Sequence, residues 1–274
     1  MKITESFLTL NQYSRPQKPL EKVTKIAVHY VGNPNTSAAA NRSYFEGLKS
    51  QIPDKTNTYR LNPDGTYMLD ANGNKIKLTY VSSHFLIGLQ GEIIQNIPLN
   101  EWSYCTNQAN GYSISIECCH PDSTGKFNEA TEQSLAELCA YLLEKFGLGA
   151  DDIIRHYDVT GKQCPLYWSP TKYQSAEVAN ARFKEFKDKV AALMKKDKPA
   201  DTAAKYYVQV GAFSNEANAK AYLATVKNTY PDAFIKKLKE MYYVQVGAFA
   251  SKINAEAFLK TVKKTYFDAF IKVM

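Results

Sequence analysis

The strongest constraint on the fold is an internal repeat near the C-terminus. The heptapeptide YVQVGAF occupies positions 207–213 and returns at 243–249, 36 residues later. Each copy opens with the alternating residues of a half-buried strand, continues through an Ala- and Lys-rich segment with helical spacing, and ends in a short Ala-Phe-Ile strand. Two such units in tandem predict a four-stranded antiparallel sheet with two helices on one face, a small α+β domain of the split β-α-β type.

The segment before the repeat predicts a domain boundary. Residues 195–205, KKDKPADTAAK, are polar, contain a proline and show no hydrophobic periodicity, which is typical of a linker. A chain of 274 residues is also longer than most single cores and sufficient for two. We therefore expect an N-terminal domain over 1–194, a linker over 195–205 and the repeat domain over 206–274.

The N-terminal domain alternates strand and helix patterns, which indicates the α/β class. One helix is well marked, because Asn128 is a candidate N-cap, an apolar stripe follows at helical spacing, and Gly147 is a stop signal. Between 56 and 81, the turn sequences Pro-Asp-Gly and Asn-Gly predict a β-hairpin excursion. Strand-like apolar runs lie at 25–31, 84–89 and 114–118, and helical patterns lie at 37–49, 129–146 and 176–194.

Charge and hydropathy limit the classes of partner and the compartment that we expect for the protein. The net charge of +7 suits a polyanionic partner, such as nucleic acid, an anionic membrane or an anionic cell wall, without choosing among them. The sequence has no run of roughly eighteen apolar residues, and Glu5, Asn11 and Gln12 interrupt any apolar core at its N-terminus. These patterns predict synthesis in the cytoplasm without a signal peptide and no insertion into a membrane.

The five cysteines are odd in number and irregular in spacing, which argues against a disulfide framework. Apolar burial is the commonest fate of a free cysteine. We therefore expect Cys105, Cys118, Cys119 and Cys139 to be inert buried residues.

His29, His156 and Cys164 form a candidate metal-ligand set. His29 lies at the C-terminal end of an apolar strand, where side chains of α/β sheets commonly meet ligands. His156 follows a second apolar strand, and a loop through Gly161 returns Cys164 eight residues later, so both side chains can reach one ion. Catalytic zinc sites use three protein ligands of these types. The alternative, a hydrogen-bonded core histidine, is the better interpretation for either histidine taken alone.

Four segments together resemble a known family. His29 after its strand, SSHFLIG with GEIIQNIPL, SISIECCHPD and RHYDVTGKQCP are similar to the zinc-dependent N-acetylmuramoyl-L-alanine amidases of the peptidoglycan-recognition and phage-endolysin type. The similarity covers most of residues 20–170. It implies a mixed central sheet flanked by helices, zinc as the cofactor, and hydrolysis of the amide between N-acetylmuramic acid and L-alanine.

The resemblance also implies roles for individual residues. His29, His156 and Cys164 fall on the zinc ligands of the family. Glu117 falls on the general base used by some branches, and Lys162 falls on the lysine near the scissile carbonyl. The alternatives are a structural salt bridge for Glu117 and a solvated loop position for Lys162.

The strand that carries Glu117 has a small, polar face. Its two-residue period places Ser113 and Ser115 on the same side as Glu117, so we expect the three side chains to line a cleft. Ser83 stands where other branches of the family carry a tyrosine, which leaves the proton transfers to Glu117. His84 is expected to pack or hydrogen-bond beside the cleft without binding metal.

The repeat pair is similar to SPOR domains, whose paired Y-x-V-Q-x-G-x-F strands this chain carries twice. Domains of this family bind the glycan strands of peptidoglycan. The resemblance implies that Tyr207, Gln209, Tyr243 and Gln245 contact glycan from one face of the sheet.

These observations predict a peptidoglycan hydrolase of the endolysin type, from a phage or prophage, that acts on the bacterial wall after the membrane is permeabilised. Its expected partners are the stem peptide and the glycan strand. The alternative is a non-catalytic peptidoglycan-recognition protein, which loss of the cysteine ligand or the base would mark, and both are present. Nucleic-acid binding is disfavoured, because YVQVGAF lacks the basic residue and aromatic spacing of RNA-recognition strands.

Overall fold

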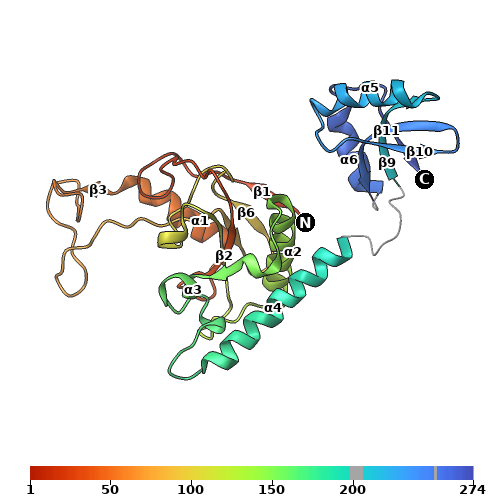
Figure 1. Ribbon diagram of the computed structural model, residues 1–274. Coiled ribbons are helices and arrows are strands. Elements are labelled where there is room, and N and C mark those ends of the chain that lie inside the picture. The colour runs from red at the N-terminus through yellow and green to blue at the C-terminus, as the bar shows by residue number, and fades with distance from the viewer. Residues whose placement is uncertain (198–205, 250–251, 274) are drawn as a thin grey trace. The chain divides into compact units, whose positions relative to one another are not determined.

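The computed structural model describes residues 1–197, 206–249 and 252–273 (Figure 1). The chain divides into two compact units, Met1–Met194 and Lys195–Met274. Of the expected linker, 198–205 lies outside the described residues, and 195–197 continue the last helix of the first unit, α4 (Ala176–Asp197). Every helix in the described part of the chain is too short or too polar to span a bilayer.

A six-stranded sheet forms the centre of the first unit. Its strand order is β1-β6-β5-β7-β2-β8. β5 and β6 pair antiparallel, and each of the other neighbouring pairs is parallel, which confirms the mixed central sheet. The strands are β1 (Ile3–Glu5), β2 (Lys25–Tyr30), β5 (Phe85–Ile87), β6 (Ile93–Gln95), β7 (Ser113–Cys118) and β8 (Ile153–Arg155).

Helices cover both faces of this sheet. β5 directs Phe85 and Ile87 into the core under α2 (Glu129–Phe146), and it directs Leu86 into the core under α1 (Ala38–Gly47). This division follows from the two-residue period of a strand. The α/β layering predicted from the sequence is confirmed.

The best-marked helix has the ends that its sequence predicts. The side chain of Asn128 accepts a hydrogen bond from the backbone N–H of Thr131 (2.9 Å), and Gly147 ends the helix in the left-handed conformation at φ 67°. The remaining helices of this unit are α3 (His156–Thr160) and the 3-10 helices η1 (Leu48–Ser50), η2 (Asn107–Ala109), η3 (Ala150–Asp152) and η4 (Leu166–Trp168).

The segment between α1 and β5 extends away from the central sheet (Figure 1). Its regular pairing is limited to β3 (Ile52–Pro53) with β4 (Arg60–Leu61), and single bridges such as Leu69 with Lys75 continue the antiparallel course. Both predicted turns are present, with Gly65 at φ 85° and Gly73 at φ 81°, conformations that favour glycine. The predicted hairpin excursion is therefore present, but most of its backbone lies outside regular strands.

The second unit is a four-stranded antiparallel sheet in the order β10-β11-β9-β12. The closing strand of each copy pairs with the opening strand of the other copy. Val208 and Val244 point to the face that carries the two helices, where they pack with Val226 and Val262. This confirms the predicted split β-α-β domain. Its elements are β9 (Tyr206–Phe213), α5 (Glu216–Lys227), β10 (Phe234–Leu238), β11 (Met241–Phe249), α6 (Lys252–Val262) and β12 (Phe270–Val273).

Candidate metal centre and catalytic cleft

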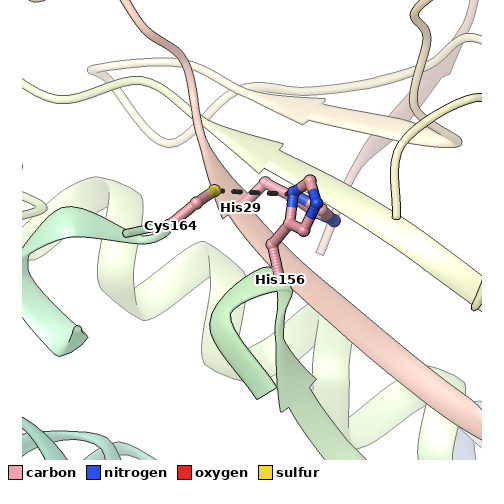
Figure 2. Close-up of side chains that lie close together, drawn as sticks. All are labelled: His29, His156 and Cys164. Carbon is pink, nitrogen blue, oxygen red and sulfur yellow. Dashed lines mark hydrogen bonds between the residues drawn. The ribbon is translucent and has the colours of Figure 1, made fainter. Parts of the chain in front are cut away.

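The structure brings the three predicted metal ligands together (Figure 2). His29 is the penultimate residue of β2, and His156 begins α3 directly after β8. Because β2 and β8 are parallel neighbours, their carboxyl ends open at the same edge of the sheet. Cys164 follows on the loop after α3. One ligand atom from each of the three residues lies within 4.8 Å of the others.

The contacts within this set fit a metal ion. Nδ1 of His29 lies 3.6 Å from Sγ of Cys164, and the ring centroids of His29 and His156 are 4.9 Å apart. All three residues are buried, with at most 5% of their surface exposed. Among the described residues, the buried Nε2 of His156 has no hydrogen-bond partner. Two imidazole nitrogens and a sulfur, with one nitrogen unpaired, are a suitable donor set for zinc.

A short loop sets the position of Cys164. α3 ends at Gly161, which adopts the left-handed conformation at φ 77° and turns the chain back. The backbone N–H of Tyr157 then donates to the carbonyl of Cys164 (3.0 Å). The guanidinium of Arg155 anchors the start of α3 by pairing with Asp158 (2.6 Å). The predicted return loop is therefore held by hydrogen bonds at both ends.

Burial sets the protonation of the three candidates. It lowers the pKa of His156 to about 4 and holds that of His29 well below 6.5, and the Lys162 ammonium acts in the same direction on both. Burial also raises the pKa of the Cys164 thiol to about 12. Both imidazoles are therefore neutral at pH 7, the form that binds metal, and the thiol releases its proton only to a metal or a base.

Glu117 lies beside this set. It pairs with His29 across β7 and β2, and together with Lys162 and Tyr44 it lines a cavity of about 490 Å³. Its Oε1 is 3.7 Å from Sγ of Cys105, and its buried Oε2 has no hydrogen-bond partner in the described part of the chain. Burial raises the pKa of Glu117 to about 8, and the positive charge of Lys162 opposes that shift. This carboxylate is a stronger base than a solvated one.

Ser113 and Ser115 do not line the cleft, so that expectation is wrong. The hydroxyl of Ser113 donates to the carbonyl of Ala109 (2.7 Å), and the hydroxyl of Ser115 lies 2.6 Å from that of Ser103. Both serines are about 1% exposed, because the segment 103–110 covers this side of β7. Of the three side chains on this face, that of Glu117 reaches the cavity.

His84 is buried behind the cleft, where it hydrogen-bonds as expected. Its Nε2 donates to the carbonyl of Glu101 (2.8 Å), and its Nδ1 accepts from the backbone N–H of Ser115 (3.0 Å). Burial lowers its pKa to about 4. His84 is therefore a neutral structural residue that supports β7 from behind.

The depressed pKa of His84 predicts acid sensitivity. The pKa of His84 is about 4 in the folded chain, against its ordinary value of 6.5. Between these two pH values the imidazole is protonated in the unfolded chain and neutral in the folded chain, so stability falls as pH falls through this range. Lowering the pH from 7 to 5 should reduce the free energy of unfolding by about 2 kcal/mol through this group alone. Denaturation followed by the fluorescence of Trp102 and Trp168 measures it.

A His84→Gln variant is the control for this prediction. It should be less stable at pH 7, because it loses a buried hydrogen bond, but its stability should depend less on pH than that of the parent. An unchanged pH slope in the variant would assign the acid sensitivity to other groups.

Two residues of the site were missed by sequence reasoning. Cys105, expected to be inert, contacts Glu117, and Oγ1 of Thr106 lies 3.0 Å from Nε2 of His29. Both lie in an irregular segment with no periodic pattern, 77 residues from His29 in the case of Thr106. No sequence signal marked them. The other three cysteines expected to be inert, Cys118, Cys119 and Cys139, are buried.

In the second unit, the four predicted glycan contacts lie on the helix-free face. Tyr207, Gln209, Tyr243 and Gln245 alternate with the valines that face the helices. Gln209 and Gln245 are register partners at the centre of the sheet. Tyr207, Gln209 and Gln245 are buried and Tyr243 is partly exposed. The sequence therefore predicted their face but not their burial.

Lysines from the edge strands cover the two tyrosines. The ammonium of Lys236 lies 3.9 Å from the ring centroid of Tyr207 and donates to its hydroxyl. The ammonium of Lys272 lies 3.5 Å from the ring centroid of Tyr243. Both amide atoms of Gln245 are buried without a hydrogen-bond partner among the described residues. The face therefore combines positive charge, aromatic rings and an unpaired amide.

Known families match both units. Residues 19–166 match the family model described as N-acetylmuramoyl-L-alanine amidase. This chain belongs to that amidase family. Residues 202–272 match the SPOR domain, so this amidase-family chain carries the second domain that its repeat predicts.

Two curated relatives of this amidase-family chain come from Bacillus species. It is 32% identical to the N-acetylmuramoyl-L-alanine amidase CwlL of Bacillus licheniformis over 180 residues, 61% of this chain and 43% of the relative. It is 30% identical to BlyA of Bacillus subtilis (strain 168) over 213 residues, 70% of this chain and 47% of the relative. The chain thus spans about half the length of these relatives. The solved catalytic domain of XlyA is 22% identical, with a TM-score of 0.48 over 69% of this chain and 99% of that domain.

Proposed function

We propose that this protein hydrolyses the amide bond between the lactyl group of N-acetylmuramic acid and L-alanine in bacterial peptidoglycan, with zinc as its cofactor. One observation carries the proposal. In a chain of the amidase family, His29, His156 and Cys164 converge within 4.8 Å, beside the carboxylate of Glu117. Such a set matches the three-ligand composition of catalytic zinc sites.

The residues of the cleft divide the chemistry among them. Zinc, when bound by the three ligands, supplies polarisation of a carbonyl and lowers the pKa of a water molecule toward about 7. Glu117 accepts the proton of the attacking water and returns it to the leaving amine. Burial raises its pKa, which makes the carboxylate a better proton acceptor, and the positive charge of Lys162 favours the ionised form that accepts the proton. The Lys162 ammonium, at the same cavity, stabilises the negative charge that develops on the carbonyl oxygen.

Product analysis tests this proposal. Purified walls incubated with the protein should release new N-terminal L-alanine without new reducing sugar ends, and elemental analysis should find one zinc per chain. Reducing ends without N-terminal alanine would show cleavage of the glycan and overturn the proposal. Binding to walls without any new termini would favour the non-catalytic recognition protein.

We further propose that the helix-free face of the second unit binds the glycan strand through Tyr207, Gln209, Tyr243 and Gln245. The amide of Gln245 has no hydrogen-bond partner among the described residues, so its donors and acceptor remain for the hydroxyl groups of a ligand. Because Tyr207, Gln209 and Gln245 are buried, this contact requires the lysine side chains that cover the face to move aside. Lys236 and Lys272 place positive charge on the same face, which suits an anionic wall.

Because peptidoglycan lies outside the cytoplasmic membrane, the protein then acts at the wall as an endolysin-type hydrolase. Its synthesis in the cytoplasm and its passage after membrane permeabilisation stay predictions.

Separating the two units should separate cutting from wall binding. Residues 1–197 should cleave soluble muropeptide at nearly the rate of the full chain but sediment poorly with intact walls, because the metal ligands and Glu117 all lie in this part. Residues 206–274 should sediment with walls without cutting them. Sedimentation with walls, before and after enzymatic removal of stem peptides, measures both. Loss of all binding by 206–274 at moderate salt would reduce its role to non-specific charge attraction.

A further inference from the structure

One segment contacts both a candidate metal ligand, His29, and the candidate base, Glu117. Thr106 is fully buried, and its Oγ1 lies 3.0 Å from Nε2 of His29. The preceding residue, Cys105, places its Sγ 3.7 Å from Oε1 of Glu117. Two consecutive residues therefore contact a candidate metal ligand and the candidate general base.

This segment is held independently of the residues that it touches. The side-chain oxygen of Asn110 accepts hydrogen bonds from the backbone N–H groups of Cys105 (3.0 Å) and Thr106 (2.7 Å). The backbone of Tyr104 is bonded to Ser82 in both directions, with the N–H of Ser82 donating to its carbonyl and its own N–H donating to the Ser82 hydroxyl. A rigid support of this kind can orient a neighbouring side chain rather than follow it.

The contact of Thr106 selects one nitrogen of His29. A histidine that binds metal through one ring nitrogen carries a proton on the other, and a hydrogen bond from that N–H fixes the tautomer and the ring orientation. Nε2 of His29 faces Thr106, and Nδ1 faces Cys164 at 3.6 Å. With the Thr106 oxygen as acceptor, Nε2 keeps its proton and the lone pair of Nδ1 points to the ligand set.

The contact of Cys105 selects one oxygen of Glu117. The thiol donates to Oε1, whereas Oε2 has no partner within the residues that the structure describes. A thiol is a weak donor, so it restrains the carboxylate without neutralising its basicity. Oε2 is left available for the transferred proton.

We propose that Cys105 and Thr106 are positioning residues, with Thr106 holding His29 in its metal-binding tautomer and Cys105 holding Glu117 with Oε2 free, both supported by Asn110. This inference rests on the proposed function, because it assigns His29 to the metal and Glu117 to proton transfer. It predicts that loss of the Thr106 contact lowers zinc affinity, whereas loss of the Cys105 contact lowers kcat.

Zinc affinity of the full chain, measured by competition with a chromogenic chelator, tests Thr106. Thr106→Val keeps the shape but removes the acceptor, and should weaken zinc binding by about 10- to 100-fold. Thr106→Ser restores the hydroxyl and should bind zinc within about threefold of the parent. Thr106→Ala removes the same oxygen without burying a further methyl group, so it repeats the test if the valine variant folds poorly.

Steady-state kinetics with soluble muropeptide test Cys105. Cys105→Ala should keep the parent zinc affinity and KM while kcat falls by about tenfold, the scale of one lost hydrogen bond. Cys105→Ser, which retains a donor, should recover most of the rate. Parent-like zinc affinity in both Thr106→Val and Thr106→Ala, or a loss of zinc in Cys105→Ala equal to that in Thr106→Val, overturns the inference. A parent chain that itself binds no zinc or cuts no muropeptide overturns the proposed function instead.

Discussion

Cys164→Ala should lose zinc and amidase activity together. The residue supplies one of three candidate ligands, and its removal leaves two buried imidazoles that hold a metal weakly. We expect zinc affinity to fall by at least about 100-fold, more than for loss of a residue that only supports a ligand. Elemental analysis after dialysis and release of N-terminal alanine from walls measure the two effects.

Cys139→Ala is the matched control for this variant. Cys139 is also fully buried, but it lies in α2 within the core. Its substitution should reduce stability through lost packing while leaving one zinc per chain. Equal zinc content in Cys164→Ala and the parent would remove the cysteine from the ligand set.

Glu117→Gln should separate chemistry from metal binding. The substitution keeps the size of the side chain and its place beside Cys105, but an amide cannot accept the proton of water at neutral pH. The variant should keep zinc and the parent unfolding midpoint, while kcat falls by at least about 100-fold, the scale of a lost general base. Muropeptide turnover at saturating substrate measures this effect.

Glu137→Gln controls for the general loss of a carboxylate. Glu137 lies on α2, where it accepts a hydrogen bond from Gln133, and it does not line the cavity that contains Glu117. The Glu137→Gln variant should turn over muropeptide at the parent rate. If Glu117→Gln does the same, then Glu117 is a structural carboxylate and the base is another group.

The parts of this structure that could be predicted are those that local pattern determines. The helix from Glu129 to Phe146 follows from a capping residue, a 3.6-residue apolar period and a terminal glycine. The repeat copies predict their own sheet, because each copy supplies strand, helix and strand in turn. His29, His156 and Cys164 were predictable as a set, because each lies where a strand or a short loop ends.

The parts that could not be predicted depend on chain segments that meet only in the folded protein. Strand period placed Ser115 on the face of Glu117, but nothing local indicates that Ser103 would cover it. Thr106 lies in an irregular segment, and its role depends on a contact across 77 residues. Likewise, the alternation of β9 gives the face of Gln209 but not its burial, which the neighbouring strands determine.

In the second unit, the sequence repeat that was duplicated does not form an independently folding sheet, as the strand order shows. The two copies of the repeat have the same sequence plan, as expected from duplication, yet β10 of the first copy pairs with β11 of the second, and β12 of the second pairs with β9 of the first. A single copy would leave its closing strand without the neighbour that it has here, and would need a second molecule to replace it. The two copies are therefore one cooperative body, in which a destabilising change in either copy is shared by both.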